Sequence, residues 1–246
     1  MKNDFTLTGY ETILTEALKS NYSFLDFKNL NDEIFNKICY LRHDIDADVS
    51  AAYKMAEVES KLGIKATYFL MLRSPVYNLF SRANQRLVEN ILGLKHNIGL
   101  HFDENFSCQY DTPLQDLIEK ELKMLEINFG NKITIVSFHQ PSTRVLTNNI
   151  KLSNVVHTYD QELFKGIHYV SDSNKNWRSV HPYHIFRKSM HNKLQLLIHP
   201  MWWVQTKNIN TRRVWKKTLI NNFEQTQKQL VETEGAFGNP LKIKLL

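Results

Sequence analysis

The stretch from Ile38 to Asp46 constrains this chain more than any other, because an apolar run there leads directly into ionisable side chains. Its first part, with isoleucine, tyrosine and leucine, is typical of a buried strand. It ends in His43, Asp44 and Asp46, which are able to bind a metal or to move protons. Since burying such groups unpaired is costly, we expect them where the strand opens to solvent. The alternative is an aspartate N-cap with an Asx turn before the following helix.

Apolar runs of strand length alternate with segments of helical periodicity along the rest of the chain. We expect strands near residues 38–46, 66–71, 97–100, 133–138, 154–158, 168–171 and 194–198. Helices are expected near residues 9–20, 49–62, 81–92, 113–128 and 210–232. This alternation indicates an α/β fold with a parallel sheet, and about seven parallel strands suit a closed or nearly closed barrel. We therefore predict a (β/α) barrel, with a doubly wound open sheet as the alternative.

The composition narrows the class of protein. With 246 residues, 42% of them hydrophobic, we expect one catalytic domain over residues 1–246, with a helical lead-in over residues 1–36. No apolar window reaches the length of a transmembrane helix, and the N-terminus has no apolar signal-peptide core, so we expect a cytoplasmic protein. Cys39 and Cys108 make neither a metal spacing nor a disulfide framework. The net charge of +6 is compatible with an anionic substrate such as a nucleotide-linked sugar, and no nucleic-acid module accompanies it.

Ionisable side chains recur where the predicted strands end. They are His43, Asp44, Asp46, His101, His139, Asp172 and His199. Active sites of barrels are built at the carboxyl ends of the strands, whereas helix capping accounts poorly for the whole set. Carboxylates with neutral imidazoles suit a divalent metal such as zinc, and a further carboxylate and histidine would serve as base and acid to hydrolyse an amide or ester. His96, at the opposite end of its strand, is predicted to be a surface histidine.

Short motifs follow one another between residues 38 and 203. They are Arg42-His43-Asp44-Ile45-Asp46, Ala66-Thr67-Tyr68-Phe69, Ile98-Gly99-Leu100-His101, Ser137-Phe138-His139-Gln140-Pro141, Asp172 with Trp177, and Leu197-Ile198-His199-Pro200. This ordered set resembles the polysaccharide deacetylase family (carbohydrate esterase family 4), especially a divergent branch with an Arg-His-Asp-x-Asp motif. The resemblance implies a distorted (β/α) barrel and metal-dependent removal of an acetyl group from an amino sugar.

The resemblance also implies a metal site and a base. Asp44 matches the catalytic base and Asp46 the metal-binding aspartate, although one residue separates them here, so the two roles could be exchanged. His101 matches the first metal histidine, whereas Asn105 stands in the place of the second. His139 stands where the family usually carries an arginine that orients the base. We predict His139 as the third ligand, with weak binding by Asn105, or a water in its place, as the alternatives.

The remaining assignments concern the acid and the substrate pocket. By resemblance, His199 matches the catalytic acid, Asp172 the residue that fixes its tautomer, and Trp177 a wall of the acyl or sugar pocket. Trp202 either stacks on a sugar ring or packs in the core. His43 takes part in substrate binding, or it points into the barrel or hydrogen-bonds a neighbour.

Together these assignments predict a deacetylase that uses one divalent ion, expected to be zinc. Its expected substrate is an N-acetyl or O-acetyl sugar in a cytoplasmic nucleotide-linked or lipid-linked precursor of a surface polysaccharide. With a lipid-linked substrate, contact with the membrane would be peripheral. The alternatives are a metal-dependent hydrolase of a non-sugar amide and a catalytically inactive carbohydrate-binding relative. The sequence makes no prediction of the oligomeric state.

Overall fold

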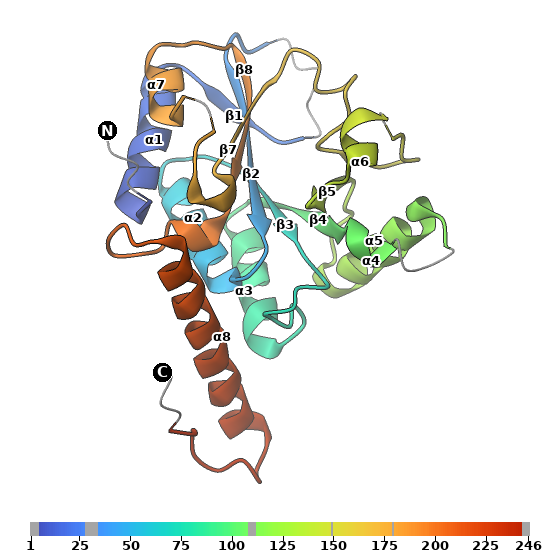
Figure 1. The fold of residues 1–246 in the computed structure, drawn as a ribbon, viewed down its shortest axis with the longest axis vertical. Coiled ribbons are helices and arrows are strands. Elements are labelled where there is room, and N and C mark those ends of the chain that lie inside the picture. The colour runs from blue at the N-terminus through green and yellow to red at the C-terminus, as the bar shows by residue number, and fades with distance from the viewer. Residues whose placement is uncertain (1–4, 28–33, 108–111, 149, 179, 243–246) are drawn as a thin grey trace.

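The computed structural model describes residues 5–27, 34–107, 112–148, 150–178 and 180–242 (Figure 1). The strands are β1 (Ser23–Leu25), β2 (Ile38–Ile45), β3 (Thr67–Leu70), β4 (Asn97–Asp103), β5 (Ile135–His139), β6 (Val156–His157), β7 (His168–Ser171) and β8 (Lys193–Ile198). The α-helices are α1 (Leu7–Lys19), α2 (Val49–Lys61), α3 (Arg82–Gly93), α4 (Glu104–Ser107), α5 (Leu114–Phe129), α6 (Thr143–Thr147), α7 (Pro182–Arg187) and α8 (Thr211–Thr233), with 3-10 helices η1 (Ser173–Lys175) and η2 (Pro200–Trp202). Among these described residues, no helix is long and apolar enough to cross a membrane.

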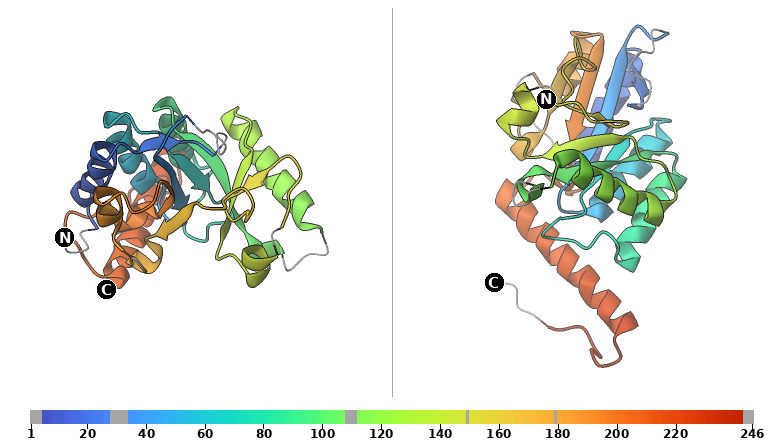
Figure 2. Two further views of the ribbon diagram at one scale, coloured as in Figure 1. Left: turned by 90° about the horizontal axis from the view of Figure 1, so that it is seen from above. Right: turned by 90° about the vertical axis from the view of Figure 1, so that its right-hand side faces the viewer.

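The strands form one parallel sheet, and their order along it is that of an opened barrel. From edge to edge the order is β6-β5-β4-β3-β2-β8-β7, and β1 pairs with the start of β2. Strands β2 to β6 are neighbours in chain order and β8 returns to β2, as in a barrel, whereas a doubly wound sheet reverses its order near the middle. In the described part of the chain, β6 and β7 are the two edges, so the sheet curls into a half-barrel with helices along its outside (Figure 2). The predicted distorted (β/α) barrel is confirmed.

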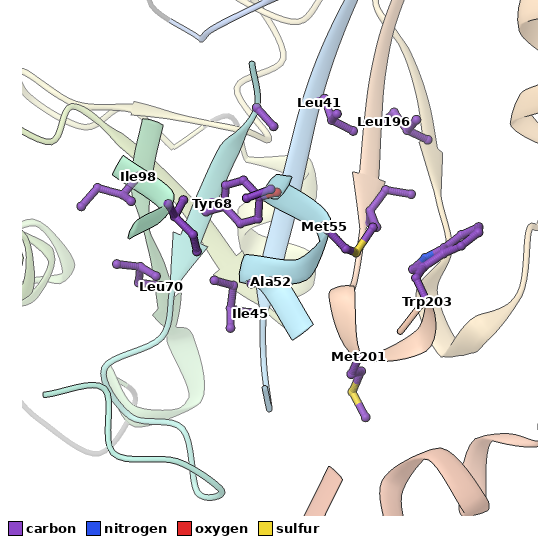
Figure 3. Close-up of a cluster of buried hydrophobic side chains, with 14 of the residues drawn as sticks. Leu41, Ile45, Ala52, Met55, Tyr68, Leu70, Ile98, Leu196, Met201 and Trp203 are labelled. Atoms are coloured by element: carbon purple, nitrogen blue, oxygen red, sulfur yellow. The ribbon is translucent and has the colours of Figure 1, made fainter. Parts of the chain in front are cut away.

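Alternation along β2 separates two cores, and every residue of this strand is buried. Leu41 and Ile45 point into the large core between the sheet and its helices, part of which Figure 3 shows. Tyr40 belongs to a smaller apolar cluster on the other face of the strand, inside the curled sheet. Because strand side chains alternate, Arg42 and Asp44 share the inner face with Tyr40. The inside of the half-barrel is thus apolar at the start of β2 and charged at its end.

Several short elements were not predicted, and β1 and α7 show why. The stretch before β2 contains the three-residue strand β1, which is too short to show an alternating pattern. The six-residue helix α7 begins at Pro182, a residue that fits the first turn of a helix. Both elements are shorter than the windows in which sequence periodicity is visible.

The inner apolar cluster gives a stability prediction at Gly99 in β4. A Cβ atom at this position would lie 2.7 Å from Cδ1 and Cε1 of the Phe69 ring, which is fully buried. We expect Gly99→Ala to lower the free energy of unfolding by about 1–3 kcal/mol, because the packed ring must move. Urea denaturation measures the change.

The matched control is Gly93→Ala at the end of α3, where an added Cβ meets nothing within 4 Å. This variant should keep the wild-type stability or gain up to about 1 kcal/mol, because alanine favours the helix. Equal stability of the Gly99 and Gly93 variants would contradict the packing described here.

Candidate active site

The end of β2 brings two carboxylates to the inside of the sheet. Asp44 lies near the end of the strand and Asp46 lies in the bend that follows. Their spacing of two residues favours the same side of the extended chain. The helix cap is a third aspartate, since Asp48 Oδ1 accepts a hydrogen bond from the Ala51 N–H at 2.9 Å and starts α2. Capping therefore accounts for Asp48 and leaves Asp44 and Asp46 available for chemistry.

Asp46, His101 on β4 and His139 at the end of β5 meet in one cluster of possible metal ligands. Asp46 Oδ1 lies 3.0 Å from His101 Nε2 and 3.4 Å from His139 Nδ1, and the two ring nitrogens are 3.2 Å apart. Ligands about 2.0–2.2 Å from a tetrahedral zinc ion lie roughly 3.3–3.6 Å from one another. These three atoms, the donor triangle, therefore have nearly the spacing of three corners of a zinc site. His139 and Asp46 are 24% and 22% exposed, so the triangle is open to solvent on one side.

The surroundings of the donor triangle favour metal binding. His101 Nδ1 lies 2.6 Å from Ser137 Oγ, a contact that can hold a proton on Nδ1, so that Nε2, which here contacts Asp46 Oδ1, could coordinate an ion. Burial raises the pKa of Asp46, but hydrogen bonds from His101 and His139 outweigh burial and hold this pKa far below its usual range. Asp46 therefore remains an anion, as a metal ligand must.

Asn105 lies apart from the donor triangle. It is exposed on α4, and its backbone N–H donates to Asp103 Oδ1 at 3.1 Å. An exposed side chain of this kind is poorly placed to bind an ion beside the buried His101. The structure therefore favours His139 over Asn105 as the third ligand.

Asp44 forms an ion pair with Arg42, a contact that was not predicted from the sequence. Arg42 Nη2 donates to Asp44 Oδ2 at 2.7 Å and Nε donates to Oδ1 at 3.1 Å, and both side chains are buried. The guanidinium also donates to Thr158 Oγ1 at 2.6 Å and to Gln195 Oε1 at 3.2 Å. Burial raises the pKa of Asp44, but Arg42 outweighs burial and lowers it, so the carboxylate stays ionised. The sequence signal for this pair was the spacing of two residues within a strand, which places both side chains on the same face.

His199 and Asp172 form a second pair, next to β2 on the side where β8 lies. His199 follows β8, and its Nδ1 lies 2.6 Å from Asp172 Oδ1, while Trp203 Nε1 donates to Asp172 Oδ2 at 2.7 Å. This contact directs the other ring nitrogen, Nε2, toward Asp46, whose Oδ2 is 3.8 Å away. Burial lowers the pKa of His199, but the Asp172 carboxylate, with smaller contributions from Asp46 and Asp44, raises it to about 9. The imidazole is therefore protonated near neutral pH.

Three predicted substrate-binding residues are buried. His43 points to the outer face of β2, where it is fully buried, and its Nε2 lies 2.6 Å from Glu59 Oε1. Trp177 and Trp202 are 7% and 6% exposed and pack in the large core. His43 has no surface to offer a substrate, which corrects its assignment as a substrate-binding residue. The two tryptophans offer very little.

The outer face of β2 carries a buried charge of its own. Glu59 on α2 accepts hydrogen bonds from Tyr10 Oη at 2.5 Å and from Tyr68 Oη at 2.8 Å. His96 adjoins this group with its Nδ1 3.5 Å from Glu59 Oε2 and accepts a hydrogen bond from the Ala66 N–H. His96 is thus buried, and its prediction as a surface histidine is wrong.

No protein-family model and no curated protein matches this chain. Several solved structures align with it at low identity. A mutant of the Bacillus anthracis CE4 family pseudoenzyme BA3943, with restored enzymatic activity, is 15% identical over 79% of this chain and 65% of that one, with a TM-score of 0.41. This chain therefore spans less than two thirds of that protein's length.

Two further structures align in the same range. The deacetylase PplD of Streptococcus pyogenes, in complex with acetate, is 12% identical over 78% of this chain and 80% of its own, with a TM-score of 0.44. A family 4 carbohydrate esterase from Bacillus anthracis is 15% identical over 87% and 86%, with a TM-score of 0.43. At these identities, the similarity is one of fold.

The donor triangle predicts which substitutions weaken metal binding. His139→Ala should weaken the affinity for Zn²⁺ by at least about 10–100-fold, because even a residue that only supports a ligand is worth that much. Asp46→Ala and His101→Ala should do the same, whereas Asn105→Ala should keep the wild-type affinity. Competition with a zinc-binding dye measures all four variants. A loss in the Asn105 variant and none in the His139 variant would assign the third ligand to Asn105.

The buried pair of Arg42 and Asp44 predicts a stability difference. Arg42→Met leaves the Asp44 carboxylate buried without its partner and should lower the free energy of unfolding by about 3–5 kcal/mol. The double variant Arg42→Met/Asp44→Asn should recover part of this loss, because the unpaired charge is gone. Urea denaturation tests both. A double variant no more stable than the single one would show that the lost stability has another origin.

Proposed function

We propose that this chain is a metal-dependent deacetylase that removes an N-acetyl or O-acetyl group from a sugar. The observation that supports this most is the position of the donor triangle between a buried carboxylate and a protonated histidine. His101 Nδ1 is 3.8 Å from Asp44 Oδ2 on one side, and Asp46 Oδ2 is 3.8 Å from His199 Nε2 on the other. A base, a metal site and an acid in this order are the groups that hydrolysis of an acyl bond requires.

Asp46, His101 and His139 would hold one divalent ion, which we expect to be zinc. When bound, such an ion lowers the pKa of water to about 7 and polarises an acyl carbonyl. The residues fit this ion because two neutral imidazoles and one carboxylate are common zinc ligands in hydrolases. The exposed edges of Asp46 and His139 leave room for water and substrate.

Asp44 acts as the base that takes a proton from the attacking water. Arg42 binds both of its carboxylate oxygens, so the carboxylate has one fixed orientation. Ser137 Oγ lies 3.4 Å from Asp44 Oδ1 and links it to His101. The lowered pKa keeps Asp44 ionised at neutral pH, and the ionised carboxylate is the form that accepts a proton.

His199 acts as the acid that protonates the departing nitrogen or oxygen of the sugar. Asp172 binds Nδ1 of His199, so that the proton on Nε2, which points toward Asp46, is the one transferred to the substrate. An amine leaves a tetrahedral intermediate poorly until it is protonated, and an acid in position accelerates this step by about 10²–10⁴-fold. With its pKa raised to about 9, His199 holds that proton under neutral conditions.

We propose a cytoplasmic nucleotide-linked or lipid-linked precursor of a surface polysaccharide as the substrate. Support comes from the net charge of +6, which attracts anionic molecules such as sugar phosphates. The test is mass spectrometry of nucleotide-linked and lipid-linked N-acetyl sugars after incubation with the zinc-loaded protein. Loss of the acetyl mass supports the proposal. Acyl release only from non-sugar amides would indicate a different hydrolase, and zinc binding without any acyl release would indicate an inactive relative.

His199→Ala separates the acid from a structural histidine. It should lower kcat for acyl release by about 10²–10⁴-fold while zinc occupancy and thermal stability stay close to wild type. Asp172→Asn should give a smaller loss, because the imidazole remains but its tautomer and orientation are disturbed. The control His184→Ala, on α7, should keep full activity. Undiminished acyl release by the His199 variant would refute the acid role, and loss of zinc would make His199 a ligand.

A further inference from the structure

The proposed metal ligand Asp46 lies in a bend between two elements of regular structure. β2 ends at Ile45 and α2 begins at Val49. We call Ile45, Asp46 and Ala47 the ligand turn. Ala47 is only 1% exposed, so its carbonyl needs a hydrogen-bond partner from the protein. The position of the Asp46 carboxylate depends on how this backbone is held.

Side chains from elsewhere hold each carbonyl of the ligand turn. The donors are Tyr77 Oη to the Ile45 carbonyl at 2.7 Å, Ser74 Oγ to the Asp46 carbonyl at 2.8 Å and Asn222 Nδ2 to the Ala47 carbonyl at 2.8 Å. Ser74 and Tyr77 lie in the loop after β3, whereas Asn222 lies on α8. Three consecutive carbonyls thus depend on side chains from two distant parts of the chain.

Asn222 joins these two parts. Its side-chain nitrogen also donates to the Val76 carbonyl at 3.1 Å, in the same loop as Ser74 and Tyr77. The helix α8 runs away from the sheet (Figure 1), and its buried residues are Val214, Thr218 and Gln227. Asn222 thus connects this helix directly to the ligand turn and to the loop that supports it.

The geometry of the donor triangle makes this support important. Metal sites tolerate deviations of only about 0.2 Å in ligand distance. Asp46 Oδ1 lies 3.0 Å from His101 Nε2, and that spacing would change if the ligand turn moved. Removing a donor leaves a buried carbonyl unsatisfied, which favours a shift of the turn toward another partner.

We infer that Asn222, together with Ser74 and Tyr77, positions the Asp46 carboxylate for metal binding. The helix α8 thereby contributes to the metal site through Asn222. This inference rests on the proposed metal-dependent function. Asn222 is a positioning residue, because it acts through the backbone of Ala47 and touches neither the ion nor the substrate.

The test is Co²⁺ binding by Asn222→Leu, a variant of similar side-chain size without the amide donors. We expect the affinity for Co²⁺ to fall by about 10–100-fold, as for other residues that orient a ligand. The d–d absorption of the bound Co²⁺ should also change in shape, because one ligand is displaced, and a merely structural role would not alter this spectrum. The control is Asn221→Leu, at the exposed neighbouring position of α8, which should match wild type in both readouts.

A second pair of variants keeps the test valid if Asn222→Leu fails to fold. Ser74→Ala should weaken Co²⁺ binding in the same way, and Ser74→Thr should restore it, because threonine keeps the hydroxyl donor. Wild-type affinity and spectrum in folded Asn222→Leu or Ser74→Ala would overturn the inference alone. A wild-type protein that binds neither Co²⁺ nor Zn²⁺ would overturn the proposed function as well.

Discussion

The cost of burying the carboxylates at the end of β2 is the constraint on which the rest of the structure depends. A carboxylate taken out of water is stable only if charged or polar partners replace its hydration. Asp44 has Arg42, whose guanidinium is in turn bound by Thr158 and Gln195. Asp46 has two histidines in place of a permanent cation, which leaves it free to bind a metal ion. The end of β2 thus carries Asp44, whose charge is neutralised by Arg42, and Asp46, whose charge is available to bind an ion.

A second buried carboxylate group lies on the opposite face of the same strand. Glu59 is fully buried, with His43 and two tyrosines around it. Burial raises the pKa of Glu59, but His43 outweighs burial and lowers it. Because each polar group here needs its partner at hydrogen-bond distance, the outer face of β2 fixes the position of the strand against α1, α2 and β3. The rigid strand then presents Asp44 and Asp46 in a defined orientation.

The strand order of the sheet brings the proposed acid, His199, next to the donor triangle. β8 pairs with β2 in register from Ile38 to His43, so His199 leaves the sheet at the end of β2, and its Nε2 lies 3.8 Å from Asp46 Oδ2. β4 and β5 approach from the other side through β3, and they carry His101 and His139. In a doubly wound sheet the order would reverse, and the last strand would not return to the first. The pairing of β8 with β2 is therefore what allows His199 and the donor triangle to meet.

The sequence by itself determined the alternation of strands and helices, the barrel, and most of the side chains that gather at the strand ends. These follow from local patterns: apolar periodicity marks the elements, and parallel strands bring their carboxyl ends to one edge. It did not determine the partners of His43 and His96, because the alternation along a strand does not say which face meets the helices. Only the tertiary structure decided that Arg42 holds Asp44 and reaches Thr158, 116 residues away, and that Asn222 supports Ala47 across 175 residues. Such contacts join segments that are neighbours only after the sheet has curled, so no local pattern in the sequence records them.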